Sequence, residues 1–234
     1  MRTAWAITPE MFLSGQEVAE LEAHVRQRVQ TTTGREHLSA RLDEFIIQAL
    51  LWSGLRNSEF CALELRDSVV GTGQPTFVVR PRGRTPGRTV WLPDSLVRLT
   101  RQWAAEYRPA FLPPTVRPDD LGQPLVFNEH RNGYDRSGLY RRVVRILTEA
   151  GLGNRASVQL LRHTYGYLAY LRTGGNLLFV QRQLGHAHPM ITRVYAQFAE
   201  ESYERMANQV AGCPPGGAGI VVPVDEDDRD RWLL

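Results

Sequence analysis

Apolar residues recur at helical spacing from the first part of the chain. Ser14 followed by Glu17 forms a capping box, the arrangement in which a helix N-terminus is closed by reciprocal hydrogen bonds. After it, apolar positions recur every three or four residues, namely at Val18, Leu21, Val25 and Val29. This spacing predicts an amphipathic helix that begins at Ser14.

Two further helices are expected before the pattern changes. Residues 38–52 carry apolar side chains on one broad face, which predicts a helix packed deep in the core. Gly54 interrupts this pattern, and a short helix is expected over residues 57–65. Its inward positions are Phe60, Leu63 and Leu65.

The pattern then turns from helical to extended. Residues 77–79 and 89–92 are rich in β-branched and aromatic side chains, and an arginine-rich turn at 82–87 separates them. Two such runs around a Gly/Pro-containing turn predict a β-hairpin. We therefore expect a small antiparallel sheet beside helices.

The rest of the chain is predicted to be helical. A helix is expected from Pro93 and Asp94 to about residue 107, and prolines then impose an extended loop up to residue 118. Residues 137–150 predict a helix with an apolar face that displays Arg141, Arg142 and Arg145. Short helices broken by glycine are expected over 157–210, so the fold class is mainly α with a small antiparallel β-sheet (α+β).

Composition suggests one main domain. We expect an N-terminal extension at 1–12, the main domain at 13–210, and a Gly/Pro-rich, then acidic, tail at 211–234. No apolar run approaches the roughly 20 residues that cross a bilayer, and the N-terminus does not resemble a secretory signal. The expected location is the cytoplasm, without membrane association.

Charge and cysteine content narrow the function classes. All 28 basic residues are arginine, and residues 1–210 hold 26 of them against 20 acids, a net charge of +6. This balance permits nucleic-acid binding without demonstrating it. Cys61 and Cys213 are too few for a disulfide framework or zinc site, so we expect no metal or other cofactor.

Three separated segments contain residues suited to phosphoryl transfer. They are residues 54–59, which begin Gly-Leu-Arg; residues 161–163, Leu-Arg-His; and residues 184–186, Leu-Gly-His, with Tyr195 nine residues after the histidine. In this order and spacing they resemble the catalytic domain of the tyrosine recombinase, or phage integrase, family. The likeness covers about residues 13–206 and includes the hairpin.

The resemblance implies a role for each motif residue. Arg56 and Arg162 would clamp the non-bridging oxygens of a phosphodiester, because a guanidinium is a bidentate donor. His186 would help to orient the phosphate, and Tyr195 would attack it to form a 3′-phosphotyrosyl intermediate without metal or ATP. Glu59, about one helical turn after Arg56, would hold that guanidinium.

The sequence departs from the family pattern at two residues and in length. Gln159 occupies the first position of the family's His-x-x-Arg-His motif. His163, which follows Arg162, is expected to support the site rather than to touch DNA. Arg82, or Arg84 in a shifted register, stands where the family places a lysine that protonates the leaving oxygen. A guanidinium donates its proton reluctantly, which predicts slow cleavage. The N-terminal helical domain by which the family closes around DNA is not expected within 1–12, so a partner chain is a candidate to supply that clamp.

Double-stranded DNA is the expected partner, with four protomers on two duplexes during recombination. Candidate backbone contacts are Arg84, Arg141, Arg142 and Arg145. Taken singly, these arginines are more typical of a solvated face, and Tyr195 of a core aromatic. Structural ion pairs are the corresponding interpretation of Arg56 and Arg162.

Two other functions stay open on the sequence alone. Arg82, Gln159 and the short N-terminus are compatible with a DNA-binding accessory or regulatory protein descended from a recombinase. A relaxing topoisomerase with the same phosphotyrosyl chemistry is the third possibility.

Overall fold

The computed structural model describes residues 8–71, 73–83 and 86–186. The chain divides into two units, Met1–Phe198 and Ala199–Leu234, and all described residues belong to the first. Its α-helices, in chain order, are α1 (Gly15–Thr31), α2 (Gly34–Ser53), α3 (Asn57–Cys61), α4 (Asp94–Gln102), α5 (Arg136–Glu149), α6 (Val158–Arg172) and α7 (Leu177–Leu184). Shorter turns of 3₁₀-helix lie at Pro9–Met11, Leu65–Asp67, Arg108–Phe111 and Gly153–Arg155.

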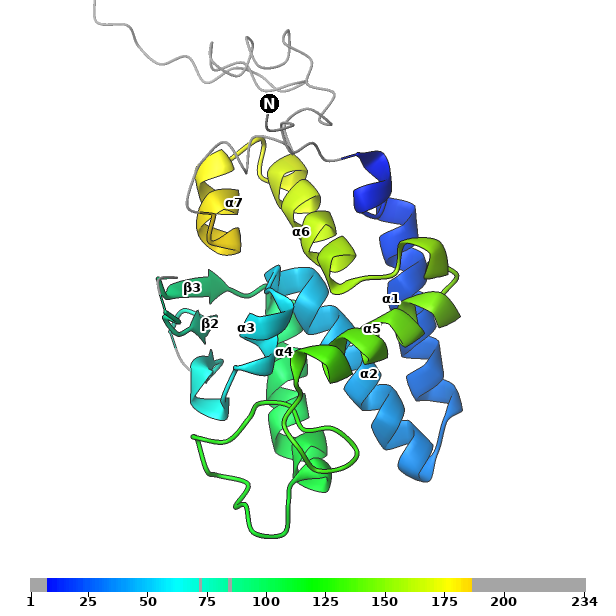
Figure 1. Cartoon of the computed structure of the whole chain (residues 1–234), viewed down its shortest axis with the longest axis vertical. Helices are drawn as coiled ribbons and strands as arrows, with labels where there is room; N and C mark the ends of the chain where they lie inside the picture. The colour runs from blue at the N-terminus through cyan, green and yellow to red at the C-terminus, as the bar shows by residue number, and fades with distance from the viewer. Residues whose placement is uncertain (1–7, 72, 84–85, 187–234) are drawn as a thin grey trace, which may run out of the picture. The chain divides into compact units, whose positions relative to one another are not determined.

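Helix α2 forms the centre of the described part. It packs against α1, α4, α5 and α6, and these helices surround it (Figure 1). Phe45, Ile46 and Ile47 are consecutive and all fully buried, as expected for a helix covered on every side. The ring of Phe45 stacks on Trp103 with centroids 4.9 Å apart. The deep core helix predicted from the sequence is confirmed.

Helix α1 begins where the capping box predicts. The backbone N–H of Ser14 donates to Glu17 Oε2 (2.8 Å), and the backbone N–H of Glu17 donates to Ser14 Oγ (3.2 Å). Its apolar positions are all buried, namely Val18, Leu21, Val25 and Val29. The capping box therefore marks the start of this helix, and the hydrophobic positions mark its inner face.

The sheet has three antiparallel strands in the order β1 (Ser68–Val69), β2 (Thr76–Val79) and β3 (Arg88–Trp91). Phe77 pairs with Val90 and both are fully buried, so the predicted hairpin is confirmed. The two-residue strand β1 was not predicted, because two residues are too few to show alternation. Strand β3 lies next to α7 (Figure 1), and this contact builds one wall of the site described below.

The third helix is shorter than predicted. Helix α3 ends at Cys61 rather than near residue 65. Beyond it the backbone pairs with a distant segment: Leu125 N donates to Leu63 O (2.8 Å), and Leu65 N donates to Gln123 O (2.9 Å). These long-range bonds satisfy the backbone groups that a continued helix would use.

The fourth helix changes type rather than ending. Helix α4 is α-helical to Gln102 and continues as a π-helical turn, Trp103–Tyr107, up to the predicted end. Trp103 is buried, and its indole N–H donates to Leu125 O (3.0 Å). The change from α-helix to π-helix therefore occurs at Trp103, where this large side chain enters the core.

Helix α5 corrects one expectation about arginines. Arg141 is exposed, but Arg142 is only 9% exposed and its Nε donates to Asp43 Oδ1 at 2.6 Å. Arg145 is also paired with Asp43, at 2.9 Å. The prediction that Arg142 is displayed on the surface is wrong, because a buried carboxylate on α2 draws it inward.

The predicted fold class, mainly α with a small antiparallel sheet, is confirmed for the described residues. Every helix among them is too short or too polar to span a lipid bilayer. The predicted domain boundary at 210 lies outside the described residues, and the boundaries at 12 and 210 both stay predictions. Cys213 and the tail at 211–234 also lie outside the described residues.

Candidate active site

Arg56 owes its position to a tight helix end. Gly54 closes α2 in the left-handed conformation (φ 63°), which residues with a Cβ adopt at a cost. A Cβ at this position would lie 2.6 Å from Tyr165 Cδ1, so glycine also permits the close approach of α6. The chain then reverses, and Arg56 becomes the residue that precedes α3.

Glu59 holds Arg56 as the sequence suggested. Arg56 Nη1 donates to Glu59 Oε1 (2.8 Å), and the backbone N–H of Arg56 donates to Oε2 of the same carboxylate (2.8 Å). The Arg56 side chain is nevertheless 39% exposed. Its guanidinium is thus anchored at one side and open to solvent at the other.

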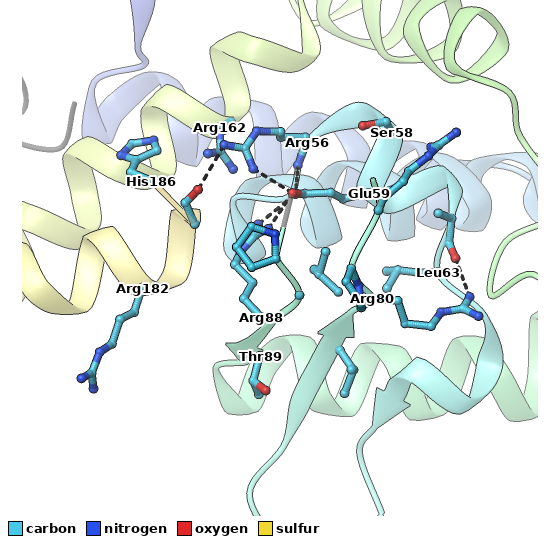
Figure 2. Close-up of a pocket in the computed structure, with 18 of the residues that line it drawn as sticks. Arg56, Ser58, Glu59, Leu63, Arg80, Arg88, Thr89, Arg162, Arg182 and His186 are labelled. Atoms are coloured by element: carbon cyan, nitrogen blue, oxygen red, sulfur yellow. Dashed lines mark hydrogen bonds and ion pairs between the residues drawn. The ribbon is translucent and has the colours of Figure 1, made fainter. Parts of the chain in front are cut away.

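Glu59 has a second arginine partner that the sequence analysis missed. Arg88 Nη1 and Nη2 donate to Glu59 Oε1 and Oε2 at 2.5 and 2.8 Å. Figure 2 shows the carboxylate between the two guanidiniums. Burial acts to raise the pKa of Glu59, but the hydrogen bonds and charge of Arg88, followed by the hydrogen bonds of Arg56, lower it to about 2. The carboxylate is therefore ionised throughout the physiological range.

Arg162 lies on the buried face of α6. It is 3% exposed, and its Nη1 donates to the carbonyl of Gly54 at 2.5 Å. Its Nη2 donates to the carbonyl of Leu184 at 2.7 Å. Arg162 thereby connects the turn before Arg56 to the end of α7.

The end of α7 is surrounded by cations. Three guanidiniums donate to three successive carbonyls: Arg88 Nε to Gln183 O (3.0 Å), Arg162 Nη2 to Leu184 O (2.7 Å), and Arg56 Nη2 to Gly185 O (3.3 Å). The last carbonyls of a helix have no partner within it and carry partial negative charge, so they attract cations. The helix end therefore brings the three arginines together.

His186 follows this helix end directly. Gly185 is in the left-handed conformation (φ 63°), and a Cβ there would lie 2.7 Å from Arg88 Cδ. Burial, then the charges of Arg162 and Arg56, lower the pKa of His186 to about 3. The imidazole is neutral near pH 7 and can still donate one hydrogen bond.

His163 and Gln159 form a pair one helical turn apart on α6. The side-chain amide nitrogen of Gln159 lies 3.0 Å from His163 Nε2. Burial and the charge of Arg162 lower the pKa of His163 to about 4. Both imidazoles of the site are thus neutral at physiological pH.

These residues line one groove of about 1640 Å³ between the hairpin, α3, α6 and α7. Six arginines and two carboxylates line it: Arg56, Arg80, Arg82, Arg88, Arg162 and Arg182, with Glu59 and Asp67. A groove with this charge excess and fixed guanidinium donors suits the non-bridging oxygens of a phosphodiester. Within the described ranges, no three His, Cys, Asp or Glu side chains gather as metal ligands would.

The model of the phage integrase family matches residues 12–202, which is most of the chain. The chain belongs to the phage integrase family. Tyrosine recombinase XerH of Helicobacter pylori is 26% identical over 200 residues, covering 85% of this chain and 49% of XerH. The chain spans about half the length of the curated relatives it matches.

Solved structures agree on the fold. XerH bound to palindromic difH substrate, a post-cleavage complex, gives a TM-score of 0.66 at 22% identity, covering 86% of this chain and 53% of that one. The catalytic domain of bacteriophage HP1 integrase gives 0.51 at 21% identity, covering 84% and 93%. The predicted tyrosine recombinase catalytic-domain fold is confirmed.

The structure does not describe every site residue that the phage integrase pattern predicted. It gathers Arg56, Arg162, His186, Gln159 and Arg82 along the groove, with Glu59 and His163. Tyr195 and Arg84 lie outside the described residues. Arg141 lines a separate surface pocket, which it shares with Arg82.

Two residues that support the groove escaped the sequence analysis. Arg88 was one of several arginines in the hairpin, and only its pairing opposite Val79 at the end of β2 directs it to Glu59. Gln183, 1% exposed, accepts from Trp91 N (3.0 Å) and donates to Trp91 O (3.1 Å). The available signal for Gln183 was a polar residue three positions after Val180 and next to Leu184, on the apolar face of its helix.

Proposed function

We propose that this chain is the catalytic domain of a site-specific DNA recombinase, which cuts and rejoins DNA through a covalent bond at Tyr195. The observation that supports it most is the meeting of Arg56, Arg162 and His186 at the end of α7, in a cationic groove. These are the residue types that a phosphoryl transfer needs when fixed donors meet the charge on the phosphate.

The proposed reaction conserves the phosphodiester bond energy. The phenol oxygen of Tyr195 attacks phosphorus, a new O–P bond forms, and the bond to the 5′-oxygen breaks. The phenol loses its proton and the departing 5′-oxygen gains one. Rejoining reverses these steps with a 5′-hydroxyl from another strand, so no ATP is required.

Arg56, Arg162 and His186 would act on the non-bridging oxygens. Arg56 uses Nη1 and Nη2 once each on protein atoms, which leaves a second hydrogen on each for a ligand. A neutral His186 donates a hydrogen bond without adding charge repulsion beside the arginines. Cationic groups near Tyr195 would favour its ionised form.

Arg82 is our candidate for the group nearest the leaving oxygen. It lines the groove, and as a guanidinium it would stabilise negative charge there but give up its proton reluctantly. Gln159 hydrogen-bonds but cannot shuttle a proton. We therefore propose that cleavage is slow compared with that of a recombinase that has lysine and histidine at these positions.

Double-stranded DNA is the proposed substrate. The solved XerH neighbour is a complex with its difH substrate, which supports a DNA-bound state for this chain too. We further propose that four protomers act on two duplexes. Because the curated relatives are about twice as long as the matched region, a second domain or partner chain would supply the remaining DNA contacts.

A DNA-binding accessory protein is the second candidate. Arg82 and Gln159 favour it, because both replace groups that move protons in the family pattern. Such a protein would keep the groove and its affinity for DNA but would form no covalent bond. The experiment below separates the two functions.

The test is a trapping assay on nicked suicide duplexes. The nick lies close to the cleavage position, so cleavage releases a short 5′-hydroxyl fragment that diffuses away, and any covalent adduct accumulates. The sequence around the nick is randomised, because the preferred site is not known. We expect the wild-type protein to give a denaturation-resistant adduct at a 3′-phosphate, and sequencing of the trapped DNA to reveal the preferred site.

The controls are two single-atom changes. Tyr195→Phe removes the proposed nucleophile and should give no adduct, whereas Tyr203→Phe removes the phenol eight residues later in the sequence and should leave adduct formation intact. DNA binding without any adduct in the wild type would overturn the recombinase and favour the accessory protein.

A further inference from the structure

Arg88 is more buried and makes more contacts with the protein than a surface cation needs. Its side chain is 10% exposed, as is that of Glu59, and the two form a bidentate pair. The third nitrogen, Nε, donates to Gln183 O at the end of α7 (3.0 Å). All three nitrogens of one guanidinium therefore have fixed acceptors.

The acceptors of Arg88 lie on the two sides of the site. Glu59 is the residue that anchors Arg56, through contacts to its backbone and its guanidinium. Gln183 stands three residues before His186 on α7. Arg88 thus joins the support of Arg56 to the helix that ends just before His186.

A neighbouring arginine shows that this arrangement is specific. Arg80 lines the same groove near the end of β2, yet it pairs with Glu64 (2.7 Å) and Asp67 (3.0 Å) and its side chain is 41% exposed. It touches neither Glu59 nor α7 in any contact that we observe. Arg80 therefore provides a matched control for a paired arginine of the hairpin.

We infer that Arg88 is a positioning residue: by sharing Glu59 with Arg56 and binding the Gln183 carbonyl, it sets the distance between Arg56 and His186 across the groove. Arg88 is 10% exposed against 39% for Arg56, so we assign it to positioning and leave contact with the substrate to Arg56. The catalytic part of this inference rests on the proposed recombinase function.

The physical reason lies in the sharing of one carboxylate. With Arg88 present, both oxygens of Glu59 are fixed, and Arg56 meets them in one geometry. Without Arg88, the carboxylate can rotate and follow Arg56, so the guanidinium samples more than one position. Small displacements of an aligned group lower rates steeply.

The first test separates chemistry from binding. In single-turnover cleavage of a trapped site at saturating DNA, Arg88→Gln should lower the rate roughly 10- to 100-fold. The dissociation constant for the same DNA should stay near the wild-type value. Arg117→Gln, a change outside the groove, should preserve the rate, and equal losses in the two variants would overturn the inference.

A pH profile gives a further readout, measured at a temperature where far-UV circular dichroism shows both proteins folded from pH 7 to pH 5. Arg56 and Arg88 are the charged groups that contact Glu59, and His163 and His186 are neutral above pH 5, with pKa values of about 4 and 3. Removing Arg88 takes away the largest lowering influence on Glu59, so its pKa rises above the wild-type value even though the hydrogen bonds of Arg56 remain. The Arg88→Gln rate should therefore fall as the pH drops from 7 to 5 more steeply than the wild-type rate, and parallel profiles would count against positioning.

A double variant distinguishes a positioning role of Arg88 from simple neutralisation of the buried Glu59 carboxylate. Arg88→Gln with Glu59→Gln removes the lone buried carboxylate and should raise the melting temperature above that of Arg88→Gln alone. The cleavage rate should stay low, because Arg56 has lost its anchor. Recovery of the wild-type rate would show that Arg88 only neutralises Glu59.

A measurement without DNA keeps the inference testable if the protein cleaves no substrate. The ¹⁵N relaxation of the Arg56 Nε–H group, assigned by its loss in Arg56→Lys, reports the order of that side chain. Arg88→Gln should lower this order and Arg80→Gln should not. Unchanged order in Arg88→Gln would refute the positioning role independently of the proposed function.

Discussion

The two imidazoles of the groove are held in their neutral form by burial and by nearby guanidiniums. Burial and Arg162 lower the pKa of His163 to about 4, and burial with Arg162 and Arg56 lowers that of His186 to about 3. An unfolded chain would protonate both near pH 6.5. The difference links the stability of the fold to pH.

The sign of this link follows from proton counting. Between pH 6.5 and about 4 the unfolded chain binds protons that the folded chain excludes, so the free energy of unfolding decreases as the pH falls. We expect a loss on the order of 1 to 2 kcal/mol per histidine at pH 5, relative to pH 7. Urea unfolding at the two pH values measures it. His186→Gln should remove the part of this loss that is due to His186. His130 is exposed, so His130→Gln serves as the control and should leave the loss unchanged. An equal pH effect in the wild type and His186→Gln would contradict the assignment.

Which residues of the site could be predicted depended on how local their signal is. Arg56, Arg162 and His186 stand in short motifs, so the resemblance nominated them directly. Arg88 has no such motif. Its contact with Glu59 depends on strand register and on the end of α7, and both are long-range consequences of folding.

At the scale of elements, two helix ends that require glycine bring the site together. Gly54 ends α2 and Gly185 ends α7, both in the left-handed conformation. At each, a Cβ would collide with the side chain of another element: Tyr165 in one case and Arg88 in the other. These positions combine backbone strain with close packing.

Replacing Gly54 by alanine separates those two costs. Gly174, which follows α6, has φ 62° and no atom within 4 Å of an added Cβ, whereas Gly54 has Tyr165 at 2.6 Å and Leu184 at 2.8 Å. Gly174→Ala should cost about 1 to 2 kcal/mol for the left-handed backbone alone. Gly54→Ala should cost roughly 1 to 3 kcal/mol more, through overpacking. Chemical denaturation of both variants measures the difference, and equal costs would show that α6 yields without strain.

Element boundaries were predictable where the signal lies within the element. The capping box at Ser14 gave the start of α1, because both partners are three residues apart. The end of α3 was not predictable, since Leu63 pairs with Leu125, 62 residues away. The inward turn of Arg142 likewise depends on Asp43, 99 residues away.

At the scale of the whole described part, the number of arginines along the groove overstates the positive charge that is available to a ligand. Of the arginines along the groove, Arg56 and Arg88 share Glu59, and Arg80 pairs with Glu64 and Asp67. Arg82 and Arg182 form no ion pair with any described residue, and Figure 2 shows Arg182 extending away from the cluster. The sequence showed the basic excess but not which cations are internally neutralised.

Arg182 is therefore expected to contribute a phosphate contact if the groove binds DNA as proposed. A cation that meets one phosphate releases condensed counterions, so removing it lowers the slope of log K against log salt concentration by about 0.9. Arg182→Gln should show this decrease in fluorescence-anisotropy titrations over a range of salt concentrations. Arg117→Gln is the matched control, because Arg117 is 82% exposed, pairs with Asp119 and does not line the groove. A salt slope that is unchanged in Arg182→Gln would mean that Arg182 meets no phosphate in the complex.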